Sequence, residues 1–364
     1  MATSQGTWGY RDRFGGAFAR TYFRRFGPGV ASSIGLGTYL GDPTDEYDER
    51  YRESITDALS TGINHVDTAI NYRYQRSERV VGEALDAADA DREEVVVATK
   101  GGFVPFDGSR PDDPGAYVRE EFVRPGHVAV DDLARGSHAI APDFLEELLD
   151  RSLTNLGVDT VDCYYVHNPE TQLTVRNREA VYEQLEAAFE RLERRREAGD
   201  IGAYGVATWE AFRVPRDHDA YLSLPEVVDR AARAAETVGA AEPGLKAIQL
   251  PFSVTMADAF TVAAHRHPEE ERDVSALEYA QAAGLDVVAS ATLAQGDLAS
   301  SIPAAVDAEL HGETAAQRAI NFARSAPGVT TALVGTSSPA HVPENVAAGT
   351  FEPLGARAFD AVFE

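Results

Sequence analysis

Short apolar runs alternate along this chain with longer stretches in which apolar residues repeat at helical spacing among Glu, Arg and Ala. The short runs predict strands at 34–36, 64–66, 95–99, 162–166, 203–206, 247–250, 286–289 and 331–334. The periodic stretches predict helices at 49–60, 77–88, 141–156, 179–198, 225–238, 275–283, 314–323 and 339–348. Eight strands, each followed by a helix, predict an α/β fold of the (β/α)8 TIM barrel class.

Glycines mark the ends of several predicted helices. Gly157 and Gly199 each follow a periodic run, and a strand begins a few residues later. A glycine at this position takes the left-handed conformation without steric cost, which ends the helix. The short connections that follow are typical of α-to-β turns in parallel barrels.

Two segments interrupt the alternation. Residues 1–31 are rich in aromatic and arginine side chains, and residues 101–140 contain four prolines. We expect 1–31 to be an N-terminal extension that either closes the bottom of the barrel or forms a flexible arm, and 32–364 to be the barrel domain. A connection as long as 101–140 is often a lid, so we expect it to cover the mouth of the barrel.

The chain is strongly acidic. Asp and Glu number 59 against 33 Lys and Arg, which gives a formal net charge of −26. This charge disfavours binding to nucleic acid or to anionic membranes. Only Lys100 and Lys246 are lysines, and such a surface is typical of proteins from a high-salt cytoplasm.

Other features favour a cytoplasmic location. The first residues, "MATSQGTW", show no basic segment followed by an apolar one, so we expect no secretory signal. The longest uncharged stretch, 325–343, contains three prolines and is not a spanning helix. The single cysteine, Cys163, excludes an internal disulfide and fits a reducing compartment.

Ionisable side chains stand at the ends of three successive predicted strands: Asp67, Lys100 and His167. Reacting groups in a parallel barrel lie at the carboxyl ends of its strands. Taken singly, each residue has an ordinary structural explanation, as a turn cap, a solvated tip or a hydrogen-bonded ring. Lys100, however, follows an apolar run, where a charge is costly unless it is paired.

These residue types together point to proton transfer. A carboxylate keeps a buried amine charged, and the ammonium in turn lowers the pKa of a nearby phenol. Tyr72, five residues after Asp67, is the candidate phenol, and Tyr74 is the alternative. With His167 as a neutral donor to a carbonyl oxygen, the set predicts a general acid that serves the reduction of a carbonyl compound.

Four collinear motifs, "GINHVDTAINY", "SERVVGEAL", "TK" and "LGVDTVDCYYVHNP", resemble those of the aldo-keto reductase family over about residues 32–349. The composition resembles that of an acidic, haloarchaeal-like member. The resemblance implies a catalytic tetrad of Asp67, Tyr72, Lys100 and His167. It also implies NAD(P)H-dependent reduction of an aldehyde or ketone with Tyr72 as the proton donor, and it implies no metal.

The resemblance further implies a set of cofactor contacts. These are Thr38, Asp67, Thr208, Gln249, Ser290, Gly335, Thr336, Ser337, His341, Glu344 and Asn345. The segment "GTSSP" would meet phosphate at a helix N-terminus, although the same letters are also ordinary helix-capping chemistry. NADP(H) is the expected cofactor and NAD(H) the alternative, because His341 is the one basic residue in 325–343.

Two departures from the family pattern stand out. Ser290 occupies a position where an aromatic ring commonly stacks on the nicotinamide, and Arg73 follows the tyrosine where glycine is usual. The cluster "HRHPEEER" at 265–272 is typical of a charged loop rather than a metal site. Cys163 lies in an apolar run and is typical of a packing residue.

We expect a monomer or weak homodimer that acts on a small-molecule carbonyl substrate. Two alternatives stay open from the sequence. One is a non-catalytic regulatory subunit that binds a nicotinamide nucleotide on the same barrel. The other is a lyase or epimerase that uses the Lys100 amine as a Schiff base.

Overall fold

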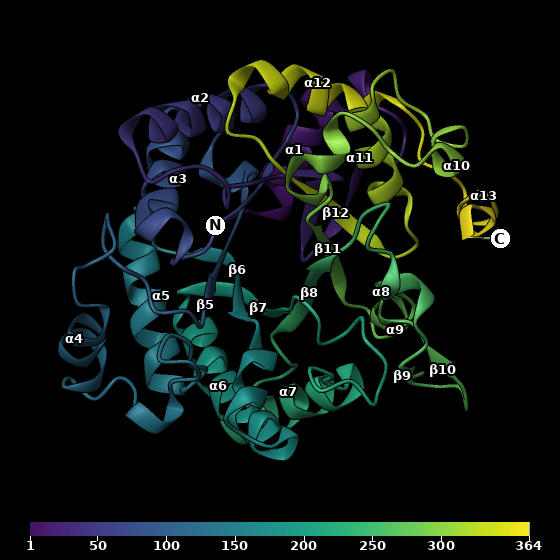
Figure 1. Cartoon of the computed structure of the whole chain (residues 1–364). Coiled ribbons are helices and arrows are strands. Elements are labelled where there is room, and N and C mark those ends of the chain that lie inside the picture. The colour runs from purple at the N-terminus through teal and green to yellow at the C-terminus, as the bar shows by residue number, and fades with distance from the viewer. Residues whose placement is uncertain (364) are drawn as a thin grey trace.

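Eight parallel strands close into a barrel (Figure 1) in the computed structural model, which describes residues 1–363 with the exception of the side chain of residue 305. The strands follow the order β11-β12-β3-β4-β5-β6-β7-β8 around the barrel. Their bounds are β3 Ile34–Gly37, β4 His65–Asp67, β5 Val96–Gly101, β6 Val161–His167, β7 Ile201–Ala207, β8 Leu245–Pro251, β11 Asp286–Ser290 and β12 Val329–Gly335. The predicted fold class is confirmed, because each expected strand has its counterpart in the barrel.

Helices surround the barrel, one after each strand. They are α2 Asp45–Thr61, α3 Arg76–Ala87, α5 Pro142–Leu156, α6 Arg178–Ala198, α7 Leu224–Val238, α9 Ala276–Ala282, α11 Ala315–Ser325 and α12 Val342–Ala347. Gly157 and Gly199 end α5 and α6 at φ values of +64° and +89°, as their positions in the sequence predict. The last helix is shorter than expected, because 339–341 form a 3-10 turn and two prolines in this segment supply no backbone N–H group.

The first residues close the bottom of the barrel. Helix α1 (Ser4–Phe14) is followed by an antiparallel hairpin of β1 (Phe23–Phe26) and β2 (Gly29–Ser32). Phe26 packs with the inward-facing Val96 and Cys163, and its ring centroid lies 5.2 Å from that of His65. The hairpin is thus a packed floor rather than a flexible arm, while the domain boundary between 31 and 32 stays a prediction.

The 101–140 segment lies beside the barrel. It contains α4 (Pro114–Val118), and its Phe122 packs against Phe144 of α5 with ring centroids 5.3 Å apart. Figure 1 shows α4 at the edge of the molecule, next to α5. The expectation of a lid is wrong, because Phe103 alone of this segment lines the cavity at the barrel mouth. The apolar residues of the loop find their partners on α5 instead.

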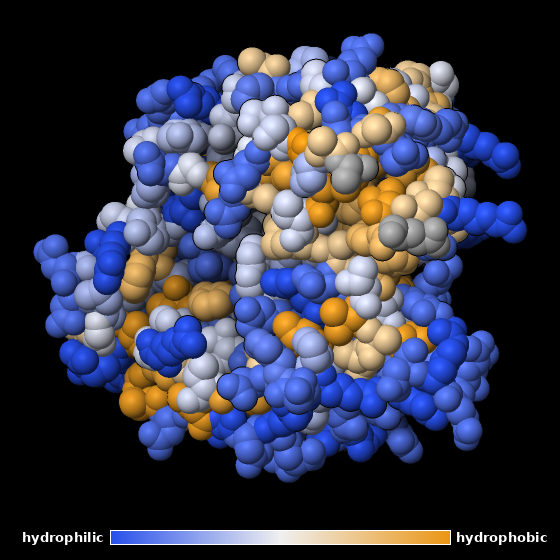
Figure 2. Space-filling model, turned by 45° about the vertical axis from the view of Figure 1, so that its right-hand side comes forward, coloured by the Kyte–Doolittle hydropathy of each residue, from blue (hydrophilic) through white to orange (hydrophobic). Residues whose placement is uncertain are grey.

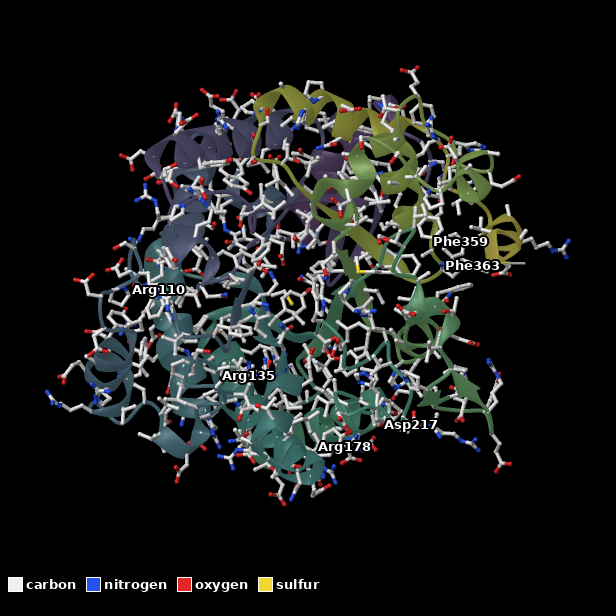
Figure 3. All side chains as sticks on the ribbon, viewed as in Figure 1. Arg110, Arg135, Arg178, Asp217, Phe359 and Phe363 are labelled. Carbon is white, nitrogen blue, oxygen red and sulfur yellow. The ribbon has the colours of Figure 1, made fainter. Side chains whose placement is uncertain are left out.

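The sequence pattern did not predict several short elements. They are α8 Asp258–Thr261, the hairpin β9 His265–Arg266 with β10 Asp273–Val274, α10 Ala304–Asp307 and α13 Ala356–Asp360. Figure 3 shows Phe359 and Phe363 close together near the end of the chain, with ring centroids 5.5 Å apart. Phe359 also lies 5.1 Å from the ring of Phe322 on α11, so this aromatic cluster holds α13 to the barrel.

Hydrophilic residues cover most of the face seen in Figure 2, and apolar residues gather toward its middle. Among the described residues, no helix combines the length and apolar character needed to cross a membrane.

Candidate active site

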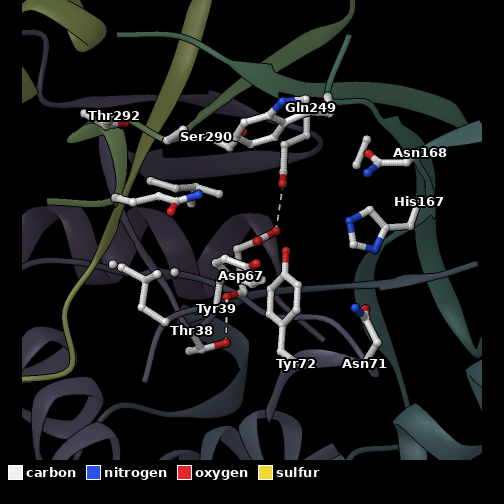
Figure 4. Close-up of a pocket in the computed structure, with 18 of the residues that line it drawn as sticks. Thr38, Tyr39, Asp67, Asn71, Tyr72, His167, Asn168, Gln249, Ser290 and Thr292 are labelled. Carbon is white, nitrogen blue, oxygen red and sulfur yellow. Dashed lines mark hydrogen bonds between the residues drawn. The ribbon is translucent and has the colours of Figure 1, made fainter. Parts of the chain in front are cut away.

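A cavity of about 560 Å³ opens at the carboxyl ends of the barrel strands. Figure 4 shows side chains from several strands and from the loops that follow them converging on it. The lining includes Asp67, Tyr72 and His167, which the sequence singled out. Lys100 lies behind this lining and is fully buried.

Lys100 and Asp67 form a buried ion pair at the base of the cavity. The Lys100 ammonium contacts the Asp67 carboxylate and donates a hydrogen bond of 2.8 Å to the carbonyl of Thr68. The second carboxylate oxygen of Asp67 accepts a 2.8 Å hydrogen bond from Gln249 Nε2. Burial alone would lower the pKa of Lys100, but Asp67 and Tyr72 more than offset it, so its pKa is raised and the amine stays charged.

Tyr72 stands over this pair. The Lys100 Nζ atom lies 4.9 Å from the centroid of its ring, and Figure 4 shows the phenol pointing toward Asp67. Burial raises the pKa of Tyr72, while Lys100 acts to lower it. Lys100 thus acts on the pKa of Tyr72 in the predicted direction, but burial outweighs it and the net pKa is raised. The ammonium limits an increase that burial causes.

His167 faces Tyr72 across the cavity, with ring centroids 6.1 Å apart. Burial, Lys100 and His138 together keep the pKa of His167 well below its usual value, so the ring is neutral. Its Nδ1 atom is buried and has no hydrogen-bond partner in the described part of the chain. A neutral imidazole at this place suits a donor to a carbonyl oxygen.

The far end of the 101–140 segment braces His167. The ring of His138 donates through Nε2 to the His167 carbonyl at 2.8 Å, and Gln172 Nε2 lies 2.9 Å from His138 Nδ1. Because Gln172 also donates to the His138 carbonyl at 2.8 Å, its amide group supplies the protons and His138 Nδ1 accepts. Phe103 packs edge-on to both histidine rings, with centroids 4.7 and 5.0 Å away.

The contacts of Arg73 explain why an arginine can stand at a position where the family usually has glycine. It adopts a left-handed φ of 47°, the conformation that a glycine would reach without strain. Its guanidinium is buried, pairs with Asp48 at 2.5 Å and donates to the carbonyl of Asp42 at 3.0 and 2.9 Å. These bonds fasten the turn that carries Tyr72 to the loop after β3, which offsets the backbone strain.

Six of the expected cofactor contacts line the cavity, and the others lie beyond it. Those in the lining are Thr38, Asp67, Thr208, Gln249, Ser290 and Gly335. The hydroxyls of Thr208 and of Thr292, which also lines the cavity, are buried without a hydrogen-bond partner among the described residues.

The remaining five expected contacts follow β12. Asn345 donates through Nδ2 to the hydroxyl of Thr336 at 2.9 Å, and both side chains are buried. His341 is exposed, while Ser337 and Glu344 are half-buried. The structure therefore groups these residues in one segment outside the cavity, and their contact with a nucleotide stays a prediction.

Sequence reasoning missed several residues of the site. Tyr39 packs on Tyr72 with ring centroids 5.0 Å apart, and Asn71, Phe103, Asn168 and Trp209 line the cavity. Asn71 and Asn168 adjoin Tyr72 and His167 in the motifs, so adjacency could have found them. No local signal links His138 to His167, because His138 stands at the end of an irregular loop and the whole of α5 separates it from the strand that carries His167.

His265 and Cys163, for which the sequence predicts no chemical role, are both buried in the fold. His265 is buried and bonds the carbonyl of Phe212 at 2.8 Å through Nε2, while burial lowers its pKa to about 4. Burial raises the pKa of the Cys163 thiol, which therefore stays protonated. Within the described residues, no group of three or more His, Cys, Asp or Glu side chains is placed to hold a metal ion.

Comparison with known proteins shows which family the chain resembles. The model of the aldo/keto reductase family matches residues 33–363. A 6-dehydroglucose reductase of Novosphingobium aromaticivorans is 32% identical over 119 residues, which cover 31% of this chain and 30% of that protein. The chain thus aligns with less than a third of the length of this curated relative.

Solved structures resemble the whole barrel. An aldo-keto reductase of Bacillus halodurans in its holo form superposes with a TM-score of 0.63 at 21% identity, covering 94% of this chain and 95% of that one. An aldo-keto reductase of Klebsiella pneumoniae in complex with NADPH gives 0.61 at 19% identity, with 94% of each chain covered. At this identity the likeness concerns the fold.

Proposed function

Because the chain belongs to the aldo/keto reductase family, we propose that it is an NAD(P)H-dependent oxidoreductase that reduces an aldehyde or ketone to an alcohol. One observation carries the proposal: the buried Lys100–Asp67 pair lies directly beneath the Tyr72 phenol, with the neutral His167 facing it across the cavity. A charged amine is costly to bury, and the Lys100 amine contacts Tyr72, whose phenol also lines the cavity.

The residues of the cavity fit a nicotinamide nucleotide. Thr208 and Thr292 line the cavity, and their buried hydroxyls have no hydrogen-bond partner among the described residues. When bound, such a nucleotide supplies the hydride for the carbonyl carbon. NADP(H) is the proposed preference, since a structural neighbour is in complex with NADPH. NAD(H) is the alternative, because His341 is the one basic side chain in 325–343 that could pair with the extra phosphate of NADP(H).

Each tetrad residue has a defined role in this proposal. His167 donates a hydrogen bond to the carbonyl oxygen and orients it, and Tyr72 delivers a proton to that oxygen. Lys100 favours the phenolate that remains, because the ammonium stabilises its charge. Asp67 holds Lys100 in place and keeps it protonated.

Replacing Tyr72 by phenylalanine tests the assignment. The change deletes the proton donor and almost no volume, so we expect turnover of an aldehyde panel to fall by roughly 10² to 10⁴. NADPH binding, followed by fluorescence quenching, should stay within severalfold. Tyr74→Phe is the matched control, because Tyr74 packs on Phe106 rather than lining the cavity. Near-normal turnover by Tyr72→Phe would contradict the proposal.

The wild-type assay also separates the alternative functions. A regulatory subunit would quench NADPH fluorescence without turning over any carbonyl compound. A Schiff-base enzyme would be trapped on Lys100 by borohydride, whereas an amine held in an ion pair by Asp67 should not react.

We further propose that the protein works as a monomer or weak homodimer in a cytoplasm of high ionic strength. The net charge of −26 and the presence of only two lysines support this setting. Rates are therefore best measured both at low salt and in molar KCl.

A further inference from the structure

One wall of the cavity is built from three neighbouring polar side chains. Figure 4 shows Asn71, His167 and Asn168 on the same side, with the Asn71 amide pointing toward the His167 ring. Asn71 Oδ1 and His167 Nδ1 are both buried and have no hydrogen-bond partner among the described residues. A buried amide oxygen without a partner is costly, so its free lone pairs indicate a group that a ligand supplies.

The backbone holds Asn168 in an uncommon conformation at this wall. Its φ and ψ are 48° and 58°, in the left-handed region, and its N–H donates to the Ala207 carbonyl at 2.6 Å. Strained positions of this kind cluster where a side chain must face a ligand. The conformation places a carboxamide in the lining immediately after His167.

The cavity offers no positive charge to an anionic substrate. No arginine or lysine occurs among its described lining residues, and the one acidic residue there, Asp67, is paired with the buried Lys100. The nearby Arg73 is buried and turned toward Asp48. A chain of net charge −26 also repels anions at long range.

We propose, on the basis of the function proposed above, that the site is built for neutral carbonyl compounds that carry a hydroxyl group on the carbon next to the carbonyl. With the carbonyl oxygen between Tyr72 and His167, the neighbouring hydroxyl donates to Asn71 Oδ1 and accepts a hydrogen bond from the Asn168 amide. The carbonyl carbon gains a hydride and its oxygen a proton, NAD(P)H becomes NAD(P)⁺, and the C–OH bond beside it stays intact.

Two isosteric ketones test this substrate class. 1-Hydroxy-2-butanone and 3-pentanone differ by a hydroxyl in place of a methyl group, and neither is charged. We expect the wild type to show kcat/KM for the hydroxyketone roughly 100-fold above that for 3-pentanone. Because the hydroxyl also activates the carbonyl, the informative quantity is the change in this ratio between wild type and variant.

Asn71→Leu should lower the ratio about tenfold, since it removes the acceptor for the hydroxyl while filling similar space. Asn168→Gly, which tolerates the left-handed backbone, should lower it severalfold and serves as a second variant. Gln295→Leu removes a carboxamide from an exposed part of the cavity lining and is the matched control, with a ratio within twofold of wild type.

A ratio that is the same in wild type, Asn71→Leu and Asn168→Gly would overturn the substrate class and leave the oxidoreductase intact. Efficient reduction of the ketone of an anionic keto acid such as pyruvate would also overturn the proposed preference for neutral substrates. Failure to reduce any carbonyl compound would instead overturn the proposed function itself.

Discussion

The two sides of the cavity differ in how their polar groups are engaged. On the side of β4, β5 and β6, Lys100 and Asp67 bond each other and their neighbours, and the backbone of His167 is braced by His138. On the side of β11, Ser290 is half-buried and the hydroxyl of Thr292 has no partner among the described residues.

The chain itself therefore satisfies the buried charges of the first side. Asn71 Oδ1 and His167 Nδ1 on that side have no partner among the described residues, as is true of the Thr292 hydroxyl on the second side. The Lys100–Asp67 pair and the backbone of His167 are preorganised, because contacts within the chain fix them. The β11 side keeps hydrogen-bonding capacity in reserve for a ligand. Under the proposed function, substitutions on the first side should reduce turnover strongly, and those on the β11 side should mainly weaken the binding of the nucleotide.

The largest effect is expected for Lys100→Met. The change removes the amine that serves Tyr72 and leaves the Asp67 carboxylate buried without its partner. Turnover should become undetectable, and the free energy of unfolding should fall by about 3 to 5 kcal/mol, the usual cost of breaking a buried pair. Rates and denaturant unfolding curves measure the two effects.

The only other lysine provides the control. The Lys246 side chain is 38% exposed and pairs with Glu242 at 3.0 Å, so Lys246→Met should change stability by less than about 1 kcal/mol and leave turnover unaltered. Equal effects of the two substitutions would mean that the buried pair has no special role.

A smaller loss is expected for His138→Leu. The variant removes the donor to the His167 carbonyl, so kcat should fall about tenfold through misplacement of the His167 ring. The Kd for NADPH should stay within twofold. His138→Gln, which keeps an N–H donor, should recover most of the activity, and a failure of this rescue would reduce His138 to a packing role.

The same residue gives a pH signature. Burial lowers the pKa of His138 to about 4 from its ordinary 6.5. The unfolded chain therefore takes up this proton first as the pH falls, and stability decreases between pH 6.5 and 4 by at most about 1.4 kcal/mol per pH unit. Below pH 4 both states are protonated and the contribution levels off. Unfolding curves of wild type and His138→Leu at pH 7 and 5 should differ in this slope.

The same contrast explains what the sequence could predict. Asp67, Lys100 and His167 stand at strand ends, so local periodicity brings them to one rim once the barrel is recognised. The contact of His138 with His167 depends on how an irregular, proline-containing loop packs on α5, for which no periodic pattern exists. The pKa of Tyr72 depends on burial outweighing a nearby charge, and that balance requires coordinates.

The smallest effect is expected beyond the cavity, at Asn345. Its amide donates to Thr336 at 2.9 Å, so the segment after β12 is already ordered before any ligand contacts it. We expect Asn345→Ala to raise the Kd for NADPH about three- to tenfold, measured by fluorescence titration, with kcat close to wild type. If Asn345 acts through Thr336, adding Thr336→Ala will have little further effect, because the two residues form one unit. Fully additive changes would show that each side chain meets the nucleotide separately, and a fall in kcat without a change in Kd would remove the distinction between the two sides.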